Sequence, residues 1–253
     1  MKLKSFALTS LSVIGGAMIA SAGDPVDAPV SPMPSEPAPA SGGLVDVIGA
    51  EISFGYDSVY MFRGVDFGDD LVWTDVNLTL PLADSLELNV GAWYAGLADD
   101  DYTELDLYAG LTYSINESLG IGVGYTQYYF PRSDFDYGEV GATLGYSIYG
   151  VDLGLGYYYD FEVEGSYYEV GASYEIVLAD SVSLVPGAVV GFGDDYYGVS
   201  GGNHVGLTLG LPIKLTSTAT LTPYVAYNLP IDALESNGED DQVYGGISLA
   251  VSF

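Results

Sequence analysis

Hydrophobic and polar residues alternate along most of this chain with a period of two. The last segment shows the pattern clearly, because Ile247, Leu249, Val251 and Phe253 are apolar and the residues between them are small or polar. Such alternation predicts a β-strand with one apolar and one polar face. The same pattern recurs along the chain and predicts twelve strands, over residues 47–63, 71–82, 86–96, 102–115, 119–130, 137–149, 151–161, 167–178, 182–193, 204–215, 218–229 and 242–253.

The composition of the two faces separates a membrane barrel from a soluble β-sandwich. A sandwich also alternates, but it rarely gathers so many Gly and acidic residues on one face and Leu, Val, Ile and Tyr on the other. Aromatic residues near both strand ends predict interfacial girdles. One girdle would hold Tyr60, Phe62, Tyr94, Tyr125, Tyr129, Tyr157, Tyr159, Tyr168, Phe192 and Tyr227, and the other Tyr113, Tyr146 and Phe253. We predict an all-β fold, a transmembrane antiparallel up-and-down β-barrel of about twelve strands.

The connections between the predicted strands alternate in length. Residues 83–85, 116–118, 150, 179–181 and 216–217 are short turns, whereas connections such as 194–203 and 231–241 are longer and mostly more acidic. This alternation is typical of periplasmic turns and external loops. An even number of strands then places both termini on the periplasmic side.

The first residues are predicted to be a targeting segment. Lys2 and Lys4 precede an apolar stretch, and residues 20–22 (Ala-Ser-Ala) form a cleavage site, so residues 1–22 are predicted to be a secretory signal peptide. Residues 23–45 are rich in proline and predict a disordered periplasmic tail. The barrel is expected to span residues 46–253 and to lie in the cell outer membrane, in contact with lipid and lipopolysaccharide.

The charge of the chain excludes several classes of function. It has 35 acidic and 5 basic residues, for a net charge of −30, and no cysteine. Nucleic-acid binding depends on Lys and Arg at phosphates, so we expect no nucleic-acid partner. Without cysteine there is no disulfide or thiolate site, and with one histidine we expect no cofactor and no resident metal.

The polar face would line the interior of the barrel. Near mid-height it carries mostly Gly, Ser, Thr and Asn, which favours a water-filled channel; alternatively, the glycines let Tyr108, Tyr128 and Tyr158 lie across them. Acidic mouths would concentrate cations. The predicted pore-lining residues are Glu51, Asp57, Arg63, Trp73, Asp75, Glu87, Trp93, Glu104, Asp106, Glu139, Asp152, Asp160, Glu169, Glu175, His204 and Lys214.

One inner patch combines a cation with both tryptophans. If Gly68 is the tip of the first hairpin, Arg63 falls opposite Trp73, and Asp75 falls opposite Trp93 across the next turn. A guanidinium group can stack on indole and pair with a carboxylate. The patch is predicted to stabilise the first hairpins or, alternatively, to form a constriction or ligand platform.

Residues 58–64 (Ser-Val-Tyr-Met-Phe-Arg-Gly), followed by residues 91–93 (Gly-Ala-Trp), resemble the TorF-type porins of Gram-negative bacteria. The segment 72–75 (Val-Trp-Thr-Asp) departs from that family, which has a glutamine-containing segment there. The resemblance implies an outer-membrane barrel of porin type without an established substrate. The terminal Phe253 is also similar to the signal that the barrel-insertion machinery reads in this class, which implies that machinery as a partner.

Two other chemistries deserve comparison. Residues 198–202 fit the G-x-S-x-G expression and His204 lies nearby, but the expression is meaningful only at a strand-to-helix elbow, so we predict no enzyme. External acids such as residues 99–101 could hold divalent cations loosely. We predict a porin-like channel for passive diffusion of small hydrophilic solutes, with cation preference. The alternative is a non-conducting structural or adhesive barrel with acidic external loops.

Overall fold

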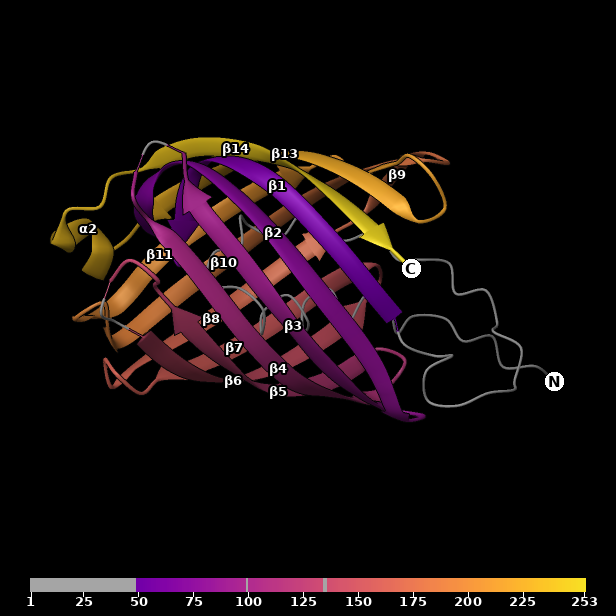
Figure 1. Ribbon diagram of the computed structural model, residues 1–253, viewed down its shortest axis with the longest axis horizontal. Coiled ribbons are helices and arrows are strands. Elements are labelled where there is room, and N and C mark those ends of the chain that lie inside the picture. The colour runs from indigo at the N-terminus through magenta and orange to yellow at the C-terminus, as the bar shows by residue number, and fades with distance from the viewer. Residues whose placement is uncertain (1–48, 99, 134–135) are drawn as a thin grey trace.

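The computed structural model describes residues 49–98, 100–133 and 136–253, which form a closed antiparallel β-barrel (Figure 1). The predicted signal peptide and proline-rich tail lie outside the described residues. The twelve long strands are β1 Gly49–Phe62, β2 Val65–Ala83, β3 Leu86–Leu97, β4 Thr103–Asn116, β5 Leu119–Tyr129, β6 Asp136–Ile148, β7 Val151–Asp160, β8 Gly165–Tyr174, β10 Val182–Tyr196, β11 Val199–Gly210, β13 Ala219–Pro230 and β14 Gln242–Ser252.

Three shorter elements complete the described chain. Strands β9 (Ile176–Ala179) and β12 (Ile213–Lys214) continue β8 and β11 and pair with β10 and β13, respectively. The helix α2 (Ala233–Asn237) lies in the connection between β13 and β14. Within the described residues, no helix has the length and apolar character needed to cross a membrane.

The barrel closes between its first and last strands. β14 pairs with β1 from Glu51↔Ser252 to Asp57↔Gly246, and every other long strand pairs with its neighbours in the chain. Closure leaves no unpaired sheet edge, which a sheet within a lipid bilayer requires because lipid offers no hydrogen-bond partners. The predicted fold class is therefore confirmed.

The outer face carries the apolar half of the alternation. Phe54, Val123 and Leu155 are each about half exposed, at 51%, 54% and 48% of their surface. Exposed rings occur toward both strand ends, for example Tyr94 and Tyr146. An apolar surface of this extent is suited to contact with lipid.

The two ends of the barrel differ in their connections. At one end, which we call the terminal end, lie Gly49, Ser252 and the tight turns that the sequence predicted, such as Asp84–Ser85. Figure 1 shows the C-terminus at this end and α2 at the other, which we call the hairpin end. Which end faces the cell exterior stays a prediction.

Two of the predicted long loops at the hairpin end are tight turns. Arg63 and Gly64 have φ of 48° and 85°, and Tyr197 and Gly198 have φ of 56° and 71°. Two successive residues with positive φ are typical of two-residue hairpin turns, where the second is commonly Gly. The prediction that Gly68 forms the first hairpin tip is therefore wrong, since Gly68 lies within β2.

Candidate functional site

The tip of the β1–β2 hairpin bends into the barrel at the hairpin end. β1 pairs with β14 only as far as Asp57, and the pairing of β1 with β2 is irregular between Val59 and Met61. Val59 and Met61 are buried against Ala226 of β13 and Tyr244 of β14. We call residues 58–70 the inner hairpin, because this segment packs against the inner faces of other strands.

Backbone contacts hold the inner hairpin in place. The Gly64 carbonyl oxygen accepts a hydrogen bond from Asn228 Nδ2 at 3.0 Å. A Cβ atom at Gly64 would lie 2.7 Å from Cβ of His204, so the close approach requires glycine. The Tyr197 hydroxyl donates to the Phe62 carbonyl oxygen at 3.3 Å. Burial raises the pKa of Tyr197 above its ordinary value.

Arg63, at the tip, reaches the wall formed by β6. Its Nη1 and Nη2 atoms lie 2.5 and 2.9 Å from the two carboxylate oxygens of Glu139, a bidentate ion pair with side chains only 8% and 3% exposed. Arg63 also donates to the Tyr196 hydroxyl. The predicted position of Arg63 opposite Trp73 is wrong, because the residue opposite Trp73 is Gly55; the error follows from the misplaced hairpin tip.

Aromatic rings surround the Arg63 guanidinium. Its central carbon lies 4.3 Å from the ring centroid of Tyr158, 4.7 Å from that of Tyr167 and 5.2 Å from that of Tyr196. All three tyrosines are buried. We call Glu139, Tyr158, Tyr167 and Tyr196 the guanidinium cage. These residues come from β6, β7, β8 and β10, which are consecutive strands of the barrel wall.

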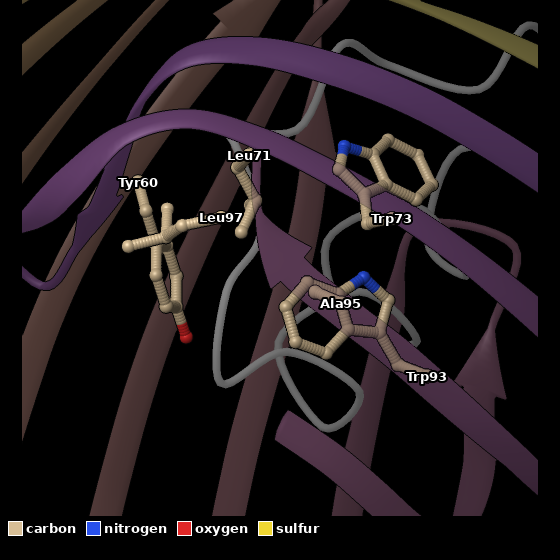
Figure 2. Close-up of a cluster of buried hydrophobic side chains, with 6 residues drawn as sticks. All are labelled: Tyr60, Leu71, Trp73, Trp93, Ala95 and Leu97. Carbon is tan, nitrogen blue, oxygen red and sulfur yellow. The ribbon is translucent and has the colours of Figure 1, made fainter. Parts of the chain in front are cut away.

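A second interior cluster contains both tryptophans. Figure 2 shows the indole rings of Trp73 and Trp93 close together, with Tyr60 beside them. Asp75 pairs with Trp93 in the register of β2 and β3, as predicted. Tyr60 was predicted in the outer girdle, but it is only 2% exposed and donates to Glu104 Oε2 at 2.6 Å. The inward bend of the hairpin explains this difference.

Two buried acidic residues inside the barrel, Asp57 and Glu104, accept hydrogen bonds from aromatic side chains. Asp57 accepts hydrogen bonds from Trp73 Nε1 at 2.6 Å and from the Tyr224 hydroxyl at 2.7 Å. The Glu104 carboxylate likewise accepts from Tyr60 and Tyr102, both at 2.6 Å. This part of the interior is therefore an ordered network of carboxylates and hydrogen-bond donors.

Burial of the predicted pore-lining residues differs between the two ends. Toward the hairpin end Asp57, Trp73, Trp93, Glu104, Asp106, Glu139, Asp160 and His204 are buried, as is the Arg63 side chain. Elsewhere Glu51, Asp75, Glu87, Asp152 and Glu175 are partly exposed, and Lys214 on β12 is exposed; Glu169, beside Tyr158 in the hairpin half, is also partly exposed. The terminal half is thus the more accessible part of the interior.

Tyrosine side chains occupy the space beside several of the inner glycines. A Cβ atom at Gly91 would lie 2.2 Å from the Tyr108 hydroxyl oxygen, and one at Gly156 would lie 2.7 Å from the Tyr158 ring. Tyr108 lies across Gly91 and contacts both Asp75 and Asn77 at 3.0 Å. The expectation that small residues keep the lumen open is wrong at these positions, where the alternative of tyrosines lying across glycines holds.

The residues of the G-x-S-x-G match do not form a nucleophile site. Ser200 lies on the strand β11, where its Oγ accepts from the Asp195 backbone at 2.9 Å. His204 is buried, with Nδ1 2.7 Å from Asn203 Oδ1. The two side chains therefore have different partners, and the elbow that gives the expression its meaning is missing from this segment.

The described residues contain no group of three His, Asp or Glu side chains arranged to hold a metal ion. Of the external acids proposed for divalent cations, Asp101 forms an exposed ion pair with Arg132, and Asp99 lies outside the described residues. Loose binding of divalent cations there stays a prediction.

The contact of Tyr167 and Tyr196 with Arg63 was not predicted from the sequence. Tyr158 and Tyr167 occupy polar-face positions of their strands, so the alternation predicts that both rings point into the barrel. The contact with Arg63 depends on the inward bend of a distant hairpin, which the local pattern does not specify.

Comparison with known proteins identifies the fold. No family model matches the chain, and no curated protein matches it. Among solved structures, an outer membrane channel from Pseudomonas putida F1 superposes with a TM-score of 0.55 at 12% identity, covering 81% of this chain and 95% of that chain. A KdgM porin gives a TM-score of 0.52 at 12% identity, covering 80% and 99%. A NanC porin gives 0.51 at 10% identity, covering 81% and 98%. This chain shares their barrel fold, and its resemblance to TorF-type porins stays a prediction.

Proposed function

We propose that this protein is a porin-like channel of the outer membrane that passes small hydrophilic solutes and prefers cations. The proposal includes export through the predicted signal peptide, contact with lipid and lipopolysaccharide, and insertion by the machinery that reads the last strand. Likeness to outer-membrane channels and porins supports the channel class.

The observation that carries the cation preference is the charge of the inner surface. Buried and partly exposed carboxylates occur along its whole length, from Glu51 to Glu104. The cations among the predicted pore-lining residues are Arg63, which is paired with Glu139, and Lys214, which is exposed on β12. A polar passage with walls of low dielectric constant amplifies such a charge excess and concentrates cations.

The inner hairpin forms the constriction of the proposed channel. Tyr60, Trp93, Tyr167 and Tyr196 are each less than 5% exposed, so side chains fill the interior near the hairpin tip. Solutes would enter the accessible terminal half and pass the constriction when the hairpin shifts. The same filling favours a second candidate, a non-conducting structural barrel, in which the hairpin is a permanent plug.

Single-channel recording in planar bilayers tests the proposal. In a potassium chloride gradient, we expect open events whose reversal potential has the sign of cation selectivity. A reversal potential showing anion preference would contradict the cation preference. Absence of conductance from both the wild-type protein and the variant Arg63→Asn, which lacks the ion pair at the hairpin tip, would establish the non-conducting barrel instead.

A matched pair of variants tests the role of inner charge. Glu87→Gln removes a partly exposed carboxylate from the inner face of β3, and Asp84→Asn removes one from the neighbouring turn. We expect Glu87→Gln to reduce cation selectivity more than Asp84→Asn. Equal effects of the two variants would show that general surface charge sets the selectivity.

A further inference from the structure

The guanidinium cage is built by the barrel wall, and its occupant comes from a different part of the chain. Glu139, Tyr158, Tyr167 and Tyr196 project from β6, β7, β8 and β10, whereas Arg63 arrives on the inner hairpin. The hydrogen bond from Tyr196 to Glu139 Oε2, at 3.0 Å, joins two cage residues without Arg63. Tyr196 and Glu139 are therefore connected to each other as well as to Arg63.

The cage has the features by which proteins recognise guanidinium groups. A carboxylate that accepts two parallel N–H bonds matches the planar fork of guanidinium, and aromatic faces favour a weakly hydrated cation. Tyr128 also donates to Glu139 Oε1, at 3.2 Å, which helps to orient the carboxylate. A small ammonium ion would satisfy the charge of this cage but not its planar geometry.

The charge near the cage exceeds what Arg63 neutralises. Asp160 lies opposite Glu139 in the register of β6 and β7, and Glu169 accepts from the Tyr158 hydroxyl at 3.2 Å. One guanidinium therefore faces three neighbouring carboxylates, so a cation remains favoured at this place whichever molecule supplies it.

Arg63 can be exchanged without removing the hairpin. The backbone of the hairpin tip is held separately, through Gly64 to Asn228 and through Phe62 to Tyr197. Glu169 and Ser173 on the inner face of β8, and Glu175 directly after this strand, are partly exposed, which gives a polar approach from the terminal half.

We propose that the guanidinium cage is a binding site for solutes that carry a guanidinium group, with Arg63 as a tethered competitor that such solutes displace. A group on a short flexible linker acts at an effective concentration of the order of millimolar, which is the lower bound for the concentration at which free guanidinium competes with Arg63. This proposal rests on the proposed function in one respect, because solutes must reach the cage through the lumen.

Thermal unfolding of the folded barrel in detergent tests the site without any need for conductance. In Arg63→Asn the cage loses its occupant, and asparagine tolerates the positive φ of this turn position. Guanidinium chloride at millimolar concentration should raise the Tm of Arg63→Asn. Urea, which has a similar planar shape and no charge, and sodium chloride at equal ionic strength should not.

Two controls assign the effect to the cage. Arg132→Asn makes the same charge change at an exposed ion pair and should show no guanidinium-specific rise in Tm. The double variant Arg63→Asn/Glu139→Gln should need at least about tenfold more guanidinium for the same rise, since a charged bidentate partner is lost. A rise of equal size in Arg132→Asn, or no rise in Arg63→Asn, would overturn the proposal.

Folding yield provides the second measurement if Arg63→Asn does not fold in buffer. Millimolar guanidinium should then restore folding of this variant, and equal yields with and without it would overturn the site. These results are separate from conductance: a silent bilayer with guanidinium binding would refute the channel and leave the site, and the reverse result would refute the site alone.

Discussion

The ion pair between Arg63 and Glu139 is expected to be a main energetic support of the inner hairpin. Both side chains are almost fully buried, at 8% and 3% exposure, and the pair is bidentate. Replacing Glu139 by Gln leaves a guanidinium inside the barrel with its principal counter-charge removed. Breaking a buried pair in this way typically costs about 3–5 kcal/mol.

The surroundings of the pair place the expected loss at the lower end of that range. The rings of Tyr158 and Tyr167 and the carboxylate of Glu169 still face the guanidinium after the substitution. We therefore expect Glu139→Gln to lower the free energy of unfolding by about 3 kcal/mol. In a double-mutant cycle with Arg63→Gln, we expect a coupling energy of about 2–3 kcal/mol.

Urea unfolding of the barrel in detergent or lipid vesicles measures these energies, with tryptophan fluorescence as the probe. Trp73 and Trp93 are the two tryptophans of the chain and both lie inside the barrel. Urea replaces guanidinium chloride as denaturant because guanidinium is proposed to bind the cage.

The protein contains its own control for this cycle. Arg132 and Asp101 form the second Arg–carboxylate pair in the described chain, with side chains 57% and 93% exposed. Exposed pairs contribute about 0–1 kcal/mol. If the cycle for Arg63 and Glu139 gave a coupling no larger than that for Arg132 and Asp101, the buried pair would not support the hairpin as argued.

Two further predictions concern the barrel wall. Gly91→Ala should destabilise the barrel by about 1–3 kcal/mol, since its Cβ would lie 2.2 Å from the Tyr108 hydroxyl and 2.6 Å from the Val76 carbonyl oxygen. Gly49→Ala is the control: apart from atoms of its chain neighbours, no described atom would lie nearer than 3.7 Å to its Cβ, so it should have little effect in the same urea titration. Deletion of Phe253 should lower the amount of protein in the outer-membrane fraction more than it lowers the single-channel conductance of refolded protein; the opposite order would contradict its role as an insertion signal.

Local alternation was sufficient to predict the barrel. The sequence of each strand specifies which side chains face lipid and which face inward, because successive side chains point to opposite faces. The pairing of Asp75 with Trp93 was also predictable, since a tight turn at Asp84–Ser85 fixes the register of the two strands that it joins.

The first hairpin could not be placed in this way. Its acidic stretch, residues 66–70, has the composition of a loop, yet these residues lie within β2 because the positive φ of Arg63 and Gly64 turns the chain earlier. The same misplaced turn put Arg63 beside Trp73, whereas the inward bend of the hairpin is what moves Tyr60 from the predicted outer surface to the interior.

The sequence by itself therefore determined the barrel, its strand number, its closing strand and the acidic character of its interior. Only the tertiary structure decided that the hairpin bends inward and that Arg63 meets Glu139. The physical reason is distance along the chain: alternation and turn geometry act between neighbours, whereas Arg63 and Glu139 are 76 residues apart and meet only when the barrel closes.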